Sequence, residues 1–126
     1  MKLAEIHFDG LLRAAVLAGP LSLFGVPVPE TSEENREGLQ GINFSADCFM
    51  LFTGVTPSHT FRMGRIRFPL DLVAITRNRV TGVVHNVLPG SKTAFRPLAD
   101  AVLETPGGWC VKNRVSSGTI LTWSFL

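Results

Sequence analysis

Apolar residues in this chain form short runs that are separated by polar, Gly-containing or Pro-containing breaks. The most extended unit covers residues 61–87, in which two runs rich in Val, Ile, Leu and Phe flank the polar stretch 76–79. Two such runs around a short polar turn are typical of a β-hairpin. We therefore predict a hairpin with arms at 61–75 and 80–87, supplying core on one face and charge on the other.

Further apolar runs predict additional strands. Residues 2–8 alternate loosely, and Asp9-Gly10 is a strong turn signal before a second run at 11–17, which would also suit a short helix. The run at 21–28 contains Pro27, which restricts it to a sheet edge or a strand end. The runs at 47–53, 101–104 and 119–125 predict three more strands, whereas 109–115 is ambiguous.

One short helix is predicted at about 31–38. Thr31 and Glu34 have the spacing of a capping box, in which each side chain accepts a hydrogen bond from the other residue's amide. Gly38 is suited to the position that ends a helix. A single short helix among many short strands predicts a mainly β fold, namely a small single-domain β-barrel or sandwich.

Composition agrees with a compact domain. The chain has 126 residues with 45% hydrophobic and 17% charged residues, which excludes an intrinsically disordered protein and predicts one domain over 1–126. Residues 14–24 are apolar, but Glu5 and Asp9 stand where a secretion signal is positive, and the run is too short to span a bilayer. We expect no signal peptide and no membrane partner.

Charge is distributed unevenly along the chain. Residues 1–50 carry three basic and seven acidic residues, whereas residues 51–126 carry nine basic and three acidic ones. This asymmetry indicates either that the two parts form ion pairs within the fold or that a basic face meets an acidic partner. A net charge of +2 is too small to imply nucleic acid, so we predict no nucleic-acid partner.

Five arginines are the candidate partner-binding residues. Arg65 and Arg67 are two positions apart and would share one strand face. They are explained either as a solvated face that protects the sheet from aggregation or as a basic patch. In the second case the patch would also include Arg62, Arg77 and Arg79.

The order of several short motifs resembles the family called domain of unknown function 192. Those motifs are Glu34-Asn35-Arg36-Glu37-Gly38-Leu39, Phe49-Met50-Leu51-Phe52, Phe61-Arg62-Met63, Pro69-Leu70-Asp71-Leu72, Leu103-Glu104-Thr105-Pro106-Gly107-Gly108 and Gly118-Thr119-Ile120. The resemblance implies a small β-barrel over 26–126, with 1–25 as an N-terminal hairpin extension. It implies no established reaction, cofactor or catalytic set. It marks Gly38, Pro69, Asp71, Glu104 and Gly108 as structural signature positions.

This chain departs from the family pattern in places. Gln40 stands where the family has Met, Arg62 or Phe61 stands at its Trp, and Thr119 replaces Asp in its late Gly-Asp pair.

Few residues suggest chemistry. Asp71 and Glu104 each interrupt an apolar strand, so they either accept hydrogen bonds from loop amides, pair with arginines, or form an acid–base pair in a cleft. His7, His59 and His85 are scattered without metal-ligand spacing, and Cys48 and Cys110 form no Cys-x-x-Cys motif. We therefore predict no catalytic residue, cofactor or metal site.

The resulting hypothesis is a non-catalytic structural or interaction module. Its apolar ends, including Leu3 and Leu126, are expected to pack against something, either within the monomer or on a neighbouring protein. Self-association is one protein contact considered, and the specific prediction is an assembly protein, such as a cement protein that decorates a phage capsid. It would then be located in the virion, and otherwise in the cytoplasm. The alternative is a small-ligand-binding β-barrel of a bacterial protein with its mouth lined by Arg65, Arg67 and Asp71; an enzyme ranks third.

Overall fold

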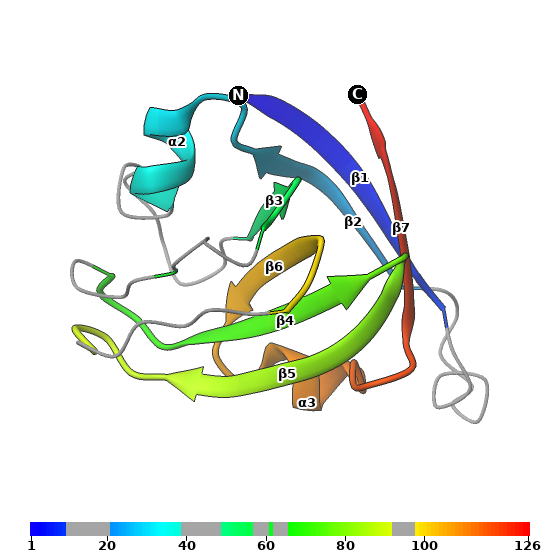
Figure 1. The fold of residues 1–126 in the computed structure, drawn as a ribbon. Coiled ribbons are helices and arrows are strands. Elements are labelled where there is room, and N and C mark those ends of the chain that lie inside the picture. Colours follow the sequence, from blue (N-terminus) through cyan, green and yellow to red (C-terminus); the bar gives the residue numbers. More distant parts are fainter. Residues whose placement is uncertain (10–20, 39–48, 57–60, 62–65, 92–97) are drawn as a thin grey trace.

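The computed structural model describes residues 1–9, 21–38, 49–56, 61, 66–91 and 98–126. Figure 1 shows strands that curl around a common interior, with the two ends of the chain on one side. The elements are, in order, β1 (Lys2–Asp9), β2 (Leu21–Val28), α2 (Ser32–Glu37), β3 (Met50–Thr53), β4 (Leu70–Thr76), β5 (Arg79–Val87), β6 (Ala101–Pro106), α3 (Trp109–Asn113) and β7 (Ile120–Phe125).

All seven strands belong to one antiparallel sheet with the order β2-β1-β7-β5-β4-β6-β3. The prediction of a mainly β fold is confirmed. The edge strands β2 and β3 approach each other, but no ladder joins them among the described strands, so the sheet curls without closing into a barrel. The prediction that the run 21–28 lies at an edge is also confirmed.

Two halves of the sheet meet between β5 and β7. Their register contains a single pair, Arg79 opposite Ile120. Just beside it, Val80 N–H donates to the Thr119 carbonyl at 2.8 Å, and Leu121 N–H donates to the Asn78 carbonyl at 2.8 Å. The β2-β1-β7 half and the β5-β4-β6-β3 half are therefore connected by a narrow seam.

The central hairpin consists of β4 and β5. Arg77 and Asn78 have φ values of 51° and 63°, the paired left-handed conformation of a type I′ turn. The predicted start of the first arm at residue 61 is wrong, because β4 begins at Leu70. Pro69 immediately precedes the strand, and a proline cannot donate a ladder hydrogen bond. Arg67 consequently lies before the strand and not on one of its faces.

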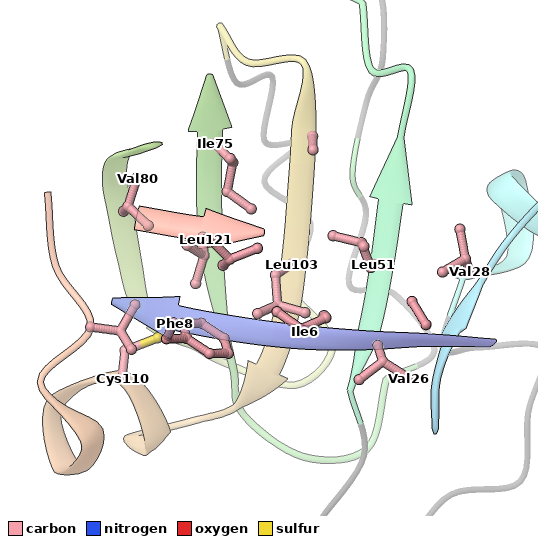
Figure 2. Close-up of a cluster of buried hydrophobic side chains, with 14 residues drawn as sticks. Ile6, Phe8, Val26, Val28, Leu51, Ile75, Val80, Leu103, Cys110 and Leu121 are labelled. Atoms are coloured by element: carbon pink, nitrogen blue, oxygen red, sulfur yellow. The ribbon is translucent and has the colours of Figure 1, made fainter. Parts of the chain in front are cut away.

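The main core lies on one side of the sheet, which we call the inner face. Every strand contributes to this inner cluster, and Cys110 and Val115 close it from the α3 side. Figure 2 shows Phe8, Leu103 and Leu121 converging there. Burial of each such large side chain stabilises the fold by about 2 kcal/mol, so the shared cluster holds the two halves of the sheet together.

A second, smaller cluster lies on the opposite, outer face of β3, β4 and β6. It contains Met50, Phe52, Val55, Phe61, Ile66, Leu70 and Val102. Phe52 and Phe61 meet edge to face, with ring centroids 5.0 Å apart. The outer face is thus covered at the β3 end of the sheet, whereas several large apolar side chains at the β2-β1-β7 end are exposed.

The capping box at the start of α2 is confirmed. Glu34 N–H donates to Thr31 Oγ1 at 3.0 Å, and Thr31 N–H donates to Glu34 Oε1 at 3.2 Å. The backbone amides of Glu30 and Thr31 both donate to the Glu34 carboxylate and hold the pKa of that carboxyl below its usual value. Gly38 ends the helix with φ 52°, as predicted. A second helix, α3, occupies the stretch that the sequence left ambiguous.

Several predicted features fall on residues outside the described ranges. These are the run at 11–17, the turn residue Gly10, and Gln40, Cys48, His59, Arg62 and Arg65. In the ranges that are described, no helix has the length and apolarity needed to cross a membrane.

Candidate functional site

Asp71 lies buried near the start of β4, where three backbone amides converge on its carboxylate. Asn86 N–H donates to Oδ1 at 2.9 Å, and Gly108 N–H donates to the same oxygen at 3.2 Å. Cys110 N–H donates to Oδ2 at 3.0 Å. Hydrogen bonds to the charged form stabilise a buried carboxylate. The interpretation that Asp71 satisfies loop amides is confirmed.

The same carboxylate caps α3. The N-cap residue Gly108 has φ 85° and no side chain to cap the helix, so Asp71 takes that role from a distant strand. Gly107 N–H also donates to the Pro69 carbonyl at 2.8 Å. Pro69, Asp71 and Gly108, three of the predicted signature positions, therefore meet in one structural junction between β4, β5 and α3.

Cys110 is a buried thiol inside this junction. Burial raises its pKa to about 12, and its Sγ lies 3.8 Å from Thr105 Oγ1. A thiol with so high a pKa carries almost no thiolate at neutral pH, so it is a poor nucleophile. Cys110 is free and acts here as a small core residue.

Glu104 lies on β6 and directly precedes Thr105, the residue that pairs with Asp71 on β4. Asp71 pairs with Thr105, whereas Glu104 pairs with Leu72 on β4 and with Met50 on β3. Neighbouring positions of a strand point to opposite faces, so Asp71 faces the inner cluster and Glu104 the outer face. The two carboxylates cannot form an acid–base pair across a cleft.

In the described part of the chain, Glu104 Oε2 lacks the hydrogen-bond donors that surround the Asp71 carboxylate. Its side chain is 5% exposed, and its Oε2 has no hydrogen-bond partner in the described part of the chain. Burial raises the pKa of the Glu104 carboxyl to about 8. Glu104 is therefore mostly a neutral acid at pH 7, and the expectation that it pairs with an arginine or with loop amides finds no partner in the described ranges.

The three candidate arginines in the described ranges, Arg67, Arg77 and Arg79, are not brought together. Arg77 and Arg79 are exposed at the β4–β5 turn, whereas Arg67 is exposed before the opposite end of β4. A seven-residue strand spans roughly 20 Å, which separates Arg67 from the turn. Arg67 and Asp71 likewise do not line a common mouth, because Asp71 is buried against amides.

An exposed apolar patch lies on the outer face of β1, β2 and β7. Leu3, Phe24 and Leu126 are 48%, 77% and 59% exposed. Leu126 N–H donates to the Leu3 carbonyl at 2.9 Å, and Leu3 pairs with Pro27 on β2. Phe24 lies in the β-bulge opposite Glu5. We call Leu3, Phe24 and Leu126 the terminal patch.

The two described histidines, His7 and His85, lie on different strands. His7 is on β1, where its ring nitrogens lie 3.1 Å from Ser22 Oγ and 3.7 Å from Glu5 Oε1. His85 is exposed on β5. Within the described residues, no three His, Cys, Asp or Glu side chains form a group that could hold a metal ion.

The junction around Asp71 could be found only in part from sequence. A carboxylate inside an apolar strand signals a buried acceptor, and the Gly107-Gly108 pair signals an unusual turn. Nothing in the sequence indicates that these two features, 37 residues apart, bind each other. That Glu104 Oε2 has no hydrogen-bond partner in the described part of the chain also depends on its neighbours in space.

Comparison with known proteins identifies the family of this chain. The sequence profile of DUF192, described as an uncharacterized ACR, matches residues 17–123. The chain belongs to the DUF192 family. The resemblance inferred from short motifs is therefore confirmed, and this match begins within the segment assigned to an N-terminal extension. Among curated proteins no match was found.

Two crystal structures share the fold of this DUF192 chain. A protein of unknown function from Novosphingobium aromaticivorans DSM 12444 has a TM-score of 0.74 at 23% identity, covering 94% of this chain and 84% of that chain. A proposed transcription regulator from Sinorhizobium meliloti 1021 has a TM-score of 0.76 at 21% identity, covering 98% and 96%. At such identities the likeness shows the shared fold alone.

Proposed function

We propose that this DUF192 chain is a non-catalytic interaction module that binds another protein through the terminal patch. The observation that carries the proposal is the exposure of Leu3 on β1, of Phe24 on the adjoining β2, and of Leu126 directly after β7. On the same strands Phe8 and Leu121 are buried in the inner cluster. Exposed apolar side chains that gather on one face are typical of protein-binding surfaces.

The chemistry of the described residues supports a binding role over a catalytic one. Asp71 is held by three amides, and Cys110 is a buried thiol with a raised pKa. Neither residue has the accessible nucleophile–base geometry that covalent catalysis requires. This arrangement favours binding through the protein surface.

The partner would present an apolar surface that covers Phe24, the most exposed member of the patch. A phage capsid is the specific partner proposed from the sequence, with the chain as a decorating cement protein. A second copy of the chain is the other protein partner that the same patch would fit, through a self-complementary contact.

The experiment measures assembly with and without the patch. A Leu3→Ser/Phe24→Ser variant is compared with Val111→Ser, which removes a 68% exposed side chain on α3. Co-sedimentation uses assembled shells of a capsid protein encoded beside the gene, and native mass spectrometry of the chain alone detects self-association. We expect the double variant to lose at least tenfold in affinity and Val111→Ser to bind normally.

Equal binding by both variants would contradict the proposed surface. A chain that stays monomeric and binds no shell would contradict the module itself. If no capsid gene lies beside its own, only the capsid form of the proposal fails.

A further inference from the structure

Glu5 lies between the three side chains of the terminal patch, on the central strand β1 (Figure 1). It is two residues from Leu3, so both side chains point to the outer face of the sheet. On β2, Phe24 lies in the β-bulge opposite Glu5. On β7, Glu5 pairs with Ser124, which comes two residues before Leu126. A partner that covers the patch must therefore also cover the Glu5 carboxylate.

The Glu5 carboxylate has little positive charge near it. Its charge partner in the described chain is His7, whose Nε2 lies 3.7 Å from Glu5 Oε1 and pairs with it only when protonated. The Nδ1 of the same ring lies 3.1 Å from Ser22 Oγ. Lys2 is engaged elsewhere, with its Nζ 3.7 Å from Glu30 Oε1. Around pH 8, where imidazole groups are neutral, no described cation balances the charge of Glu5.

A purely apolar surface laid over Glu5 would bind at a disadvantage. An ionised carboxylate that loses its water without gaining a counter-ion opposes association, and this opposition subtracts from the gain of the apolar contacts beside it. A basic side chain placed opposite the carboxylate supplies a charge-assisted hydrogen bond instead. An acidic side chain at the same place would be repelled. The charge of Glu5 thus discriminates between partners that the apolar side chains alone would accept.

We propose that the protein bound by the terminal patch presents a Lys or Arg side chain among apolar residues, and that this basic group pairs with Glu5. The inference rests on the proposed function, because it requires the patch to be a protein-binding surface. Leu3, Phe24 and Leu126 provide the apolar contact, and Glu5 determines which apolar surfaces are accepted.

The probe is a library of random peptides displayed on phage, selected around pH 8 on the full chain. Three variants are used in parallel: Glu5→Gln, Leu3→Ser/Phe24→Ser, and Asp100→Asn, which removes an exposed carboxylate beside the β4–β5 turn. We expect the unchanged chain and Asp100→Asn to enrich peptides with Lys or Arg beside apolar residues. Glu5→Gln should enrich apolar peptides without this bias, and Leu3→Ser/Phe24→Ser should enrich neither kind.

Affinities of a selected peptide then isolate the charge pair. The peptide is synthesised with its basic residue and with Gln in that place, and fluorescence anisotropy measures the binding of both forms. The basic form should bind the unchanged chain about fivefold more tightly than the Gln form. Glu5→Gln should bind the two forms within about twofold of each other, because the charge that distinguishes them is gone.

A selection without basic bias, or a basic preference that Glu5→Gln retains, would overturn the role of Glu5. A library that yields no peptide dependent on Leu3 and Phe24 would overturn it as well. Thermal unfolding verifies that the variants are folded. Peptides that need the patch but show no charge preference would leave the proposed interaction module standing, whereas the shell and self-association assays decide the module itself.

Discussion

Asp71 and Glu104 are buried carboxyls on adjacent strands, yet their surroundings differ completely. Asp71 accepts three backbone N–H groups, whereas Glu104 Oε2 accepts none in the described chain. The difference follows from where each lies along its strand. Asp71 is close to the end of β5 and the start of α3, where amides are free of intrahelical or ladder bonds.

Glu104, in contrast, lies in the middle of a ladder. β6 pairs with β3 on one side and with β4 on the other, so the strand amides around Glu104 are used by their neighbours. Burial by itself therefore does not determine whether an acid stabilises a fold. The presence of unpaired hydrogen-bond donors near the side chain determines it.

The largest expected effect is at Asp71. Asp71→Ala leaves three N–H groups without an acceptor, and we expect the free energy of unfolding to fall by about 4–5 kcal/mol. Urea denaturation followed by circular dichroism measures it. Asp100 is the control, because it is exposed and accepts a bond from Arg77 N–H at 2.9 Å; Asp100→Asn should cost under about 1 kcal/mol.

The second prediction concerns pH and Glu104. Its pKa rises from 4.5 to about 8 on folding, so between these values the folded chain keeps a proton that the unfolded chain has lost. The free energy of unfolding therefore falls as pH rises, by about 1.4 kcal/mol per unit. From pH 5 to pH 7 the loss is about 3 kcal/mol, measured by urea denaturation at each pH.

Glu104→Gln removes this titration and should make stability nearly independent of pH over the same range. Its free energy of unfolding should match that of the unchanged chain near pH 4.5 and exceed it at pH 7. Parallel pH profiles for the two proteins would show that Glu104 is ionised and paired in the folded state.

The third prediction tests how closely the Asp71 junction is packed. A Cβ at Gly107 would lie 2.6 Å from Asn86 Oδ1 and 2.8 Å from Pro69 Cβ. Gly107→Ala should therefore cost about 1–3 kcal/mol, since the neighbours must move. Gly82→Ala meets nothing within 4 Å and should change stability by less than about 0.5 kcal/mol. Equal melting temperatures for both variants would contradict the close packing.

The smallest effect is expected at Asn86, which donates to Asp71 with a left-handed backbone. Its φ is 50°, a conformation that Asn tolerates better than most residues. Asn86→Ala should cost about 1 kcal/mol, and Asn86→Gly should be within about 0.5 kcal/mol of the unchanged chain. A loss for Gly as large as that for Ala would show that the Asn86 side chain, which both variants remove, matters more than its backbone conformation.

Local chemistry explains which parts of the fold were predictable. The capping box of Thr31 and Glu34 and the hairpin turn at Arg77 and Asn78 depend on residues close in sequence. The start of β4 was misplaced because the apolar pattern continues through Phe68, whereas ladder pairing starts only after Pro69. The hydrophobic pattern alone does not indicate at which residue the backbone begins to pair with a neighbouring strand.

The site was predictable to a lesser extent. Asp71 was correctly interpreted as an acceptor of loop amides, but its role at α3 requires knowing that β4 and residues 107–110 adjoin. The arginines were grouped because they are close in sequence, whereas β4 separates Arg67 from Arg77. Whether Glu104 has a hydrogen-bond partner depends on β3, β4 and β6 together. It cannot be predicted from the sequence of any one of these strands.

The single pair that joins β5 to β7 has a consequence for cooperativity. Among the described strands, β5 and β7 share one register pair, Arg79 and Ile120. The backbone hydrogen bonds between the halves are confined to the few residues around that pair. The inner cluster draws side chains from both halves. All-or-none unfolding of this chain would therefore depend on shared side-chain packing, and core truncation at Leu121 would let the halves exchange amide hydrogens as separate units.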